Sequence, residues 1–281
     1  VVTADTAGRG CTVVAIITDL WPRREPLLPR VQKPARYIGG EGGAVTPDWG
    51  PHKVAWLLGY PDTYEVGLPN QGLQILYEIL NERDDALAER TYAPWVDLEE
   101  QLRTLDVPLF SVDTHRPARD FDVLAFNLSA ELVYTNLLNC LDLAGLPIHT
   151  ARRADADPLV AVGGHAAFSP EPVADFVDLV VLGDGEEVVS EITEVVAAWK
   201  RAGKPEGSRE RLLRDLAVIE GGYAPSLYDV SYDGPHIAEV APRFADVPEV
   251  VEKPRVPRLP GRQDHPSGPG APGRAGHPDD R

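Results

Sequence analysis

In three short segments of the chain, an apolar run of strand length is followed by Gly, Pro or acidic residues. These residue types are suited to binding a ligand. They lie at residues 54–67, 160–165 and 180–187. In an open α/β sheet, ligands bind in the crevice outside the carboxyl ends of the strands. The three segments are therefore expected to line a single ligand site.

The first segment offers a carboxylate and a glycine. Asp62 follows the apolar run 54–60, where its carboxylate can hydrogen-bond a ligand, a neighbouring His or a loop amide. An Asx-turn or the start of a helix would use the same residue. Gly67 suits a ligand loop and a simple turn alike. Both interpretations of each residue stay open at the level of the sequence.

The next candidates follow two further apolar runs. Ser129 comes shortly after Phe126, where its hydroxyl can either cap the next helix or face a ligand in the crevice. Gly163 and Gly164 directly follow a predicted strand and let another group approach the backbone closely. His165 beside them is a candidate ligand or base, although a single loop His is more often neither.

The third segment combines glycines with acidic residues at the expected start of a helix. Gly183, Gly185 and Glu186 are therefore candidates for holding a cofactor. Acidic residues at a helix start also favour the helix dipole without any ligand, and they disfavour phosphate there. No Gly-x-x-x-x-Gly-Lys-Ser/Thr phosphate loop occurs in the chain. No catalytic residue and no metal ligand is assigned, because no Ser-His-Asp set, zinc-binding His pair or pair of catalytic carboxylates can be placed.

Composition narrows the class of protein. The 281 residues are 43% hydrophobic and 25% charged, which is typical of a globular protein, and the net charge of −17 argues against a nucleic-acid partner. The apolar run from Cys11 to Leu20 is about half as long as a membrane helix, which needs roughly 20 residues, so no membrane association is expected. Only one other cysteine, Cys140, occurs far along the chain, and this usage favours a reducing cytoplasm.

Hydrophobic periodicity predicts strands that alternate with helices, which is typical of parallel βαβ units. The expected fold is an α/β flavodoxin-like (cobalamin-binding-like) parallel sheet of about five strands with helices on both faces. Asp97 is the predicted N-cap of the second helix. Strands are predicted near 54–60, 90–94, 108–112, 122–128, 159–162 and 179–182, and helices near 72–82, 98–105, 133–144, 186–200 and 208–219.

Composition shifts divide the chain into four parts. Residues 1–52 are broken by prolines and are predicted to form an extended leader or strap, ahead of the sheet domain at 53–200. Residues 201–253 are predicted to form a helix and a small β-hairpin, because apolar residues alternate around Asp233-Gly234. Residues 254–281 contain almost no large apolar side chain, so we expect them to be disordered.

Six stretches contain contiguous runs of Gly, Pro, aromatic and acidic residues: Leu28–Glu41, Tyr60–Gly67, Gly72–Tyr77, Ala93–Trp95, Gly163–Gly164 with Ser169–Pro172, and Gly183–Glu187. Taken together, they resemble the N-terminal half of a bacterial radical-SAM protein family with a cobalamin-binding-like domain. The resemblance covers about residues 28–253.

The resemblance implies a partner domain. In that family the sheet domain precedes a radical-SAM barrel, whose Cys-x-x-x-Cys-x-x-Cys loop holds a 4Fe-4S cluster that cleaves S-adenosylmethionine. Cys11 and Cys140 are too far apart to supply three thiolate ligands. The chain is therefore expected to be a truncated, catalytically inactive module, with the cluster and S-adenosylmethionine restricted to a full-length relative. The abrupt change in composition after Lys253 is interpreted as a frameshift or as plain disorder.

The resemblance also implies a cofactor. Asp62 and Gly67 match the Asp-x-His-x-x-Gly loop of cobalamin-binding domains, and Tyr64 stands where the axial His would be. Ser129 lies near the second loop of such domains, and Gly163-Gly164 match the third. Cobalamin would therefore bind without a protein imidazole below its cobalt. The alternatives are a non-catalytic flavodoxin-like interaction or regulatory domain without a cofactor and, more weakly, a flavin or nucleotide binder.

Overall fold

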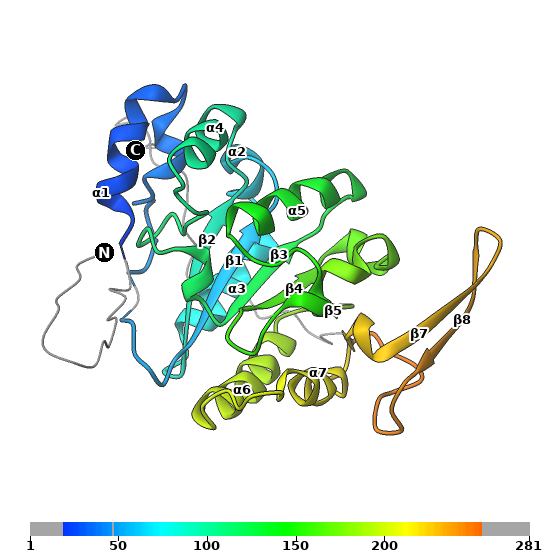
Figure 1. The fold of residues 1–281 in the computed structure, drawn as a ribbon. Coiled ribbons are helices and arrows are strands. Elements are labelled where there is room, and N and C mark those ends of the chain that lie inside the picture. The colour runs from blue at the N-terminus through cyan, green and yellow to red at the C-terminus, as the bar shows by residue number, and fades with distance from the viewer. Residues whose placement is uncertain (1–18, 47, 255–281) are drawn as a thin grey trace, which may run out of the picture.

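A mostly parallel sheet of six strands forms the centre of the computed structural model, which describes residues 19–46 and 48–254 (Figure 1). The strands lie in the order β2-β1-β3-β4-β5-β6, and only β6 is antiparallel to its neighbour. The first five follow the order of flavodoxin-like folds. The predicted α/β class and the four predicted parallel strands are confirmed. The strands are β1 (Val54–Tyr60), β2 (Ala86–Tyr92), β3 (Val123–Asn127), β4 (Leu159–Gly163), β5 (Leu179–Val181) and β6 (Gly222–Tyr223).

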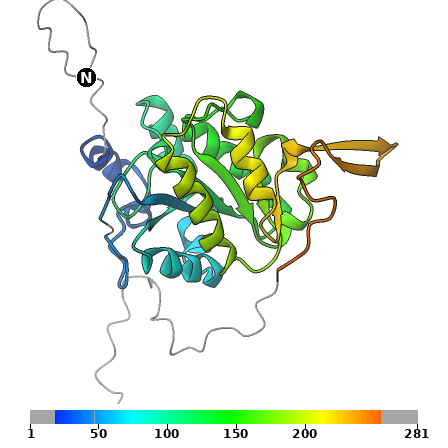
Figure 2. The ribbon, with the colours of Figure 1, turned by 90° about the horizontal axis from the view of Figure 1, so that it is seen from below.

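Helices cover both faces of this sheet, as the continuous apolar runs of the central strands require. Every residue of β1 is buried. Helices α3 (Gln71–Asn81), α6 (Val188–Arg201) and α7 (Arg209–Ala217) lie on one face, and α4 (Val96–Thr104) and α5 (Tyr134–Leu143) lie on the other (Figures 1 and 2). The remaining short elements are α2 (Tyr64–Gly67), η3 (Ala118–Asp120), η4 (Glu131–Val133), η5 (Thr150–Arg152), η6 (His165–Phe168), η7 (Glu171–Phe176) and η8 (Pro225–Leu227).

Three local predictions were wrong, each because tertiary contacts outweigh the local pattern. Strand β2 begins at Ala86 and not at Arg90. The predicted strand 108–112 makes only an isolated bridge between Phe110 and Pro117. Asp97 is not the N-cap of α4, which is Trp95; instead its carboxylate accepts a hydrogen bond from the backbone N–H of Gln32, at 2.8 Å.

The leader is also not extended where the structure describes it. It forms the short turns α1 (Trp21–Arg24), η1 (Glu25–Arg30) and η2 (Pro34–Tyr37), each with a proline near its first position, where proline suits a helical start. Leu27 and Tyr37 bury these turns against the body. Residues 1–18, with Cys11, lie outside the described residues, as do all residues of the predicted disordered tail 254–281 except Pro254.

The predicted hairpin is confirmed as β7 (Tyr228–Asp233) and β8 (His236–Pro242), an antiparallel pair that turns at Gly234, with φ +59°. It projects away from the sheet domain (Figures 1 and 2). Within the part of the chain that the structure describes, no helix has the length and apolar character needed to cross a membrane.

Candidate ligand site

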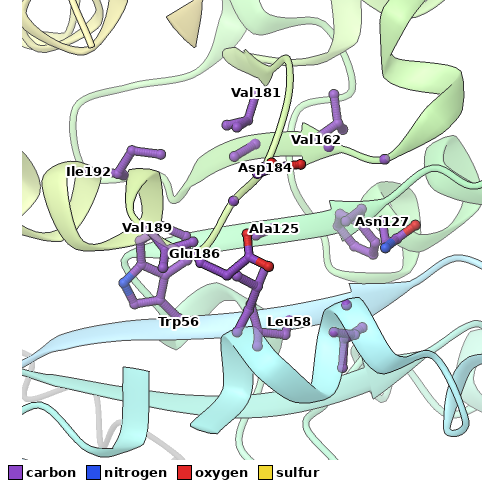
Figure 3. A pocket seen from close by; sticks show the side chains of 18 of the residues that line it. Trp56, Leu58, Ala125, Asn127, Val162, Val181, Asp184, Glu186, Val189 and Ile192 are labelled. Atoms are coloured by element: carbon purple, nitrogen blue, oxygen red, sulfur yellow. The ribbon is translucent and has the colours of Figure 1, made fainter. Parts of the chain in front are cut away.

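A cavity of about 250 Å³ opens near the carboxyl edge of the sheet, between the strands and helices α3 and α6 (Figure 3). Its interior is apolar: β1 contributes Trp56 and Leu58, α3 contributes Leu73, and α6 contributes Val189 and Ile192. The indole N–H of Trp56 already donates to Thr193 Oγ1 of α6, at 3.1 Å. The cavity can therefore hold an apolar group, and it lies where a doubly wound sheet binds its ligand.

Among residues 19–46 and 48–254, three polar side chains line this cavity. Asn127 ends β3, and Asp184 and Glu186 lie in the loop between β5 and α6 (Figure 3). Asn127 Nδ2 is 3.4 Å from Asn70 Oδ1, and its Oδ1 accepts a hydrogen bond from Ser129. The polar side chains that the structure describes here are thus one amide and two carboxylates, and the carboxylates accept hydrogen bonds when ionised.

Three glycines line the cavity at positions where neither the backbone conformation nor the packing requires glycine. None of Gly72, Gly163 and Gly185 has a positive φ. An added Cβ would lie 3.5 Å from Asn70 Oδ1 at Gly72, 3.7 Å from Val181 O at Gly163, and 3.4 Å from Leu76 Cδ2 at Gly185. These are ordinary contact distances, so alanine would fit at each position. The missing side chains let a ligand approach the backbone closely.

At two further positions that line the cavity, the backbone conformation itself favours glycine. Gly164 has φ +98° and Gly183 has φ +120°, which favour glycine over any other residue. An added Cβ would lie only 2.7 Å from Leu128 O at Gly164 and 2.8 Å from Pro254 O at Gly183. These two residues shape the loops, and the first three leave the cavity open.

Five of the nine predicted cofactor-binding residues therefore line one cavity, and a sixth lies beside it. The five are Gly163, Gly164, Gly183, Gly185 and Glu186. Ser129 lies next to them: its hydroxyl accepts from Tyr60 Oη at 3.1 Å and donates to Asn127 Oδ1 at 2.9 Å. The N-cap of α5 is Val133, so Ser129 does not cap that helix.

Asp62 and Gly67 do not line the cavity. Asp62 Oδ1 accepts from the backbone N–H of the next residue, Thr63, at 2.6 Å, whereas an Asx-turn uses the N–H two residues on. An added Cβ on Gly67 would lie 2.7 Å from Tyr60 Cβ and 2.6 Å from Tyr92 Cδ1. Packing against two tyrosines therefore explains why this position is glycine.

Tyr64 lies in a buried group of polar side chains, which we call the Arg90 cluster: Glu41, Tyr64, Arg90 and Asp113. Tyr64 Oη donates to Glu41 Oε1 at 2.6 Å, and Arg90 Nη2 donates to Glu41 Oε2 at 2.8 Å and to Asp113 Oδ1 at 2.5 Å. Burial and the Glu41 carboxylate raise the pKa of Tyr64 well above its ordinary value, so the phenol stays protonated. Tyr64 is thus engaged in this cluster and does not line the cavity.

The other candidates carry no site. His165 is exposed and does not line the cavity. Cys140 is buried, and burial raises the pKa of its thiol to about 12, which keeps it protonated. Among residues 19–46 and 48–254, no group of three or more His, Cys, Asp or Glu side chains is placed to hold a metal ion.

Sequence reasoning missed the walls of the cavity. Trp56 and Leu58 belong to a strand in which every residue is buried, so no alternation of polarity reveals which of them face a ligand. Asn127 could have been found from its place at the end of β3, beside the predicted Ser129.

Comparison with known proteins places this geometry in a family. The family model described as "Radical SAM proteins, N-terminal" matches residues 72–225, which is more than half of the chain and includes all five strands from β2 to β6. Neither a curated protein nor a solved structure matched the chain. On the strength of the family model, the chain belongs to the N-terminal domains of radical-SAM proteins.

Proposed function

We propose that this domain is the ligand-binding N-terminal module of a radical-SAM protein and that it holds a corrinoid of the cobalamin type at the mouth of the cavity. The observation that carries the proposal is the set of three glycines, Gly72, Gly163 and Gly185, at which alanine would fit but would narrow the cavity. Glycines of this kind suit a large ligand that lies close against the backbone.

The chemistry of the cavity lining fits a corrin. A corrin is a broad, flat macrocycle whose edge bears amide groups, and the Asp184 and Glu186 carboxylates can accept hydrogen bonds from amide N–H groups. The cavity of about 250 Å³ is smaller than the roughly 300–1,000 Å³ typical of sites that enclose a whole ligand. It therefore takes one group of such a ligand, while the macrocycle lies outside.

One element of a cobalamin site does not fit. Tyr64 donates its hydroxyl to Glu41 and is only 9% exposed, so it offers no ligand to cobalt. When bound, a corrinoid supplies a cobalt ion that can carry a methyl group or exchange electrons. In the present proposal the domain contributes the surface that positions this ligand, and the residue at position 64 does not coordinate it.

The reaction itself is assigned to a partner. We propose that a radical-SAM barrel supplies the 4Fe-4S cluster and binds S-adenosylmethionine, and that the present chain is catalytically inactive alone. Cys140 supports this division because it is buried and protonated, whereas a cluster ligand must be a thiolate.

The proposal is tested by equilibrium dialysis and absorbance spectroscopy with hydroxocobalamin. We expect the wild-type chain to bind it and Gly163→Ala to weaken binding at least about tenfold, since one methyl group narrows the mouth without straining the fold. Gly42→Ala is the matched control, because an added Cβ at Gly42 meets no atom within 4 Å and the residue does not line the cavity.

Binding that is absent from the wild-type chain, or equal in both alanine variants, would contradict the proposal.

The alternative function is that of an interaction domain without a cofactor. The observation that favours it is the projecting hairpin, on which Tyr232 and Ile237 are 59% and 48% exposed. That alternative predicts no binding of hydroxocobalamin at any concentration that leaves the protein folded.

A further inference from the structure

We infer that the hairpin β7–β8 and the apolar side chains next to it form one docking surface, which is covered by a folded partner with an apolar and basic surface. Six exposed apolar side chains make up this docking surface: Leu132, Phe168, Tyr232, Ile237, Val240 and Val250. The partner is the radical-SAM barrel, and that identity rests on the proposed function.

The hairpin has one apolar face. Val230 pairs directly with Val240, and the next pair on this face is Tyr232 with Ile237. Residues 231–240 are all exposed. An isolated two-stranded hairpin is marginally stable at best in water. A partner that covers the apolar face would therefore stabilise the hairpin as well as bind it.

Val250 connects the hairpin to the loop that follows β4. At the base of the hairpin, Tyr228 Oη donates to Pro248 O at 2.8 Å. Two residues further on, Val250 is 73% exposed. Lys253 Nζ then lies 5.1 Å from the centroid of the Phe168 ring, at the end of η6. Exposed apolar side chains thus continue from the hairpin to Phe168.

Leu132 extends the docking surface to the loop that follows β3, and its side chain is 89% exposed. Tyr134, two residues further on, donates from its Oη to Ala166 O at 2.8 Å and to Ser169 O at 3.1 Å. These two carbonyls lie on either side of Phe168 in the chain. The loop of Leu132 is therefore in contact with the loop of Phe168.

The docking surface also borders the cavity. Lys253, which lies over Phe168, immediately precedes Pro254. The carbonyl oxygen of Pro254 lies 2.8 Å from an ideal Cβ on Gly183, and Gly183 lines the cavity. A partner on this surface is thus adjacent to the proposed ligand. This position favours the domain that has to reach the ligand over an unrelated protein.

Carboxylates accompany the apolar side chains of the docking surface. Residues 228–242 contain three Asp or Glu and no Lys or Arg. Glu131 and Glu249 are exposed and directly precede Leu132 and Val250. A second copy of the chain would bring the same carboxylates and a further net charge of −17, so like charge opposes self-association. A partner with Lys and Arg around an apolar patch is complementary to this surface.

The C-terminal residues of the chain itself offer too little apolar area to take the partner's place. Residues 255–281 contain two large apolar side chains, Val256 and Leu259, against six on the docking surface. A separate folded domain is therefore the better occupant.

The test mixes the full chain, with p-benzoylphenylalanine in place of Tyr232, with the radical-SAM barrel of a full-length relative. The visible absorbance of its iron–sulfur cluster shows that the barrel is folded. We expect ultraviolet light to join position 232 to the barrel, and mass spectrometry locates the bond. The control carries the same group in place of Leu105, which is 43% exposed but outside the docking surface, and should give no bond to the barrel.

Crosslinks to a second copy or to residues 255–281, or no crosslink at all, would overturn the inference. The same group at the aligned position of the intact relative repeats the test within one chain, so the result does not depend on a barrel that folds alone. A bond from that position to the relative's own barrel is expected there.

Two variants measure the contributions of apolar area and of charge. Tyr232→Ser should weaken the binding of the barrel at least about tenfold, as truncation of a buried interface tyrosine commonly does, and Leu105→Ser should not. Glu249→Lys should weaken it several-fold, whereas Glu100→Lys makes the same charge change at an exposed position of α4. Equal losses within either pair would overturn the assignment of the docking surface.

The binding of hydroxocobalamin by the wild-type chain alone separates this inference from the proposed function. A chain that binds hydroxocobalamin but not the barrel overturns only the docking surface. A chain that binds the barrel through position 232 but no hydroxocobalamin supports the docking surface and defeats the proposed ligand.

Discussion

The cavity and the Arg90 cluster lie in one domain, but their polar side chains differ in how deeply they are buried. In the Arg90 cluster, the side chains of Glu41, Arg90 and Asp113 are 1%, 1% and 2% exposed, and their charges are paired with one another. At the cavity, Asp184 and Glu186 are only partly buried and border about 250 Å³ of space. Removing one partner of a buried charge pair is costly because the other charge is left uncompensated, whereas carboxylates beside an open volume can also meet a ligand.

The same contrast separates two kinds of glycine. Gly67 fits between Tyr60 and Tyr92, where any side chain would collide with them. Gly163 lines the cavity, and a methyl group added to it would lie 3.7 Å from Val181 O, an ordinary contact distance. Residue type alone therefore does not identify a ligand site. What distinguishes the two glycines is the space around each.

The largest expected effect comes from removing the cation of the Arg90 cluster. Arg90→Ala leaves the carboxylates of Glu41 and Asp113 buried without their partner, and we expect it to lower the free energy of unfolding by about 3–5 kcal/mol. Urea denaturation followed by circular dichroism measures this loss. The control is Arg211→Ala, which removes an exposed i,i+4 pair with Asp215 and is expected to cost about 0.3–0.5 kcal/mol. Similar losses in the two variants would show that the cluster is not a structural core.

A smaller and pH-dependent effect is expected from Glu41. Burial raises the pKa of Glu41, but the Arg90 guanidinium and the Tyr64 hydroxyl outweigh burial and hold this pKa below its ordinary value. The ionised group therefore contributes stability above the unfolded pKa of about 4.3, and this contribution is lost as the pH falls through the lower folded pKa.

Glu41→Gln is thus expected to lower the free energy of unfolding by about 1.5–3 kcal/mol at pH 7, the typical value of hydrogen bonds to a charged group. The difference from wild type should shrink as the pH falls below about 4.3. Urea denaturation at pH 7, 5, 4 and 3 measures it. A difference that stays constant down to pH 3 would mean that Glu41 is not held ionised by the cluster.

Much of the fold could be predicted from the sequence because its central strands are buried on both faces. The runs at 54–60, 122–128, 159–162 and 179–182 are apolar for nearly their whole length, and each contains a strand. Strand β2 was misplaced because Glu89, which lies within it, looks like a loop residue. Its carboxylate is satisfied by Trp49 Nε1, at 2.8 Å, and by Thr114 Oγ1, which are distant in sequence.

The candidate site was predictable to the extent that it follows from topology. Gly163 and Gly185 follow strands of a parallel sheet, so they lie at its carboxyl edge whatever the details of packing. Tyr64 and Gly67 also follow such a strand, but they belong to the short helix α2, which packs beside Tyr92. The direction in which this short helix packs separates Tyr64 and Gly67 from the cavity. The sequence carries no signal for that direction.

The smallest expected effect is the most informative one, because the same substitution should stabilise the fold and weaken ligand binding. Gly72 is the second residue of helix α3, has no positive φ, and lines the cavity. Gly72→Ala reduces the conformational entropy of the unfolded chain, so we expect it to raise the free energy of unfolding by about 0.4–1 kcal/mol. The same methyl group narrows the mouth, so binding of hydroxocobalamin should weaken. Urea denaturation and equilibrium dialysis on the same preparation measure both quantities. A variant that is more stable and binds as well as wild type would show that the space beside Gly72 is not used by a ligand, because a folding defect could not account for that result.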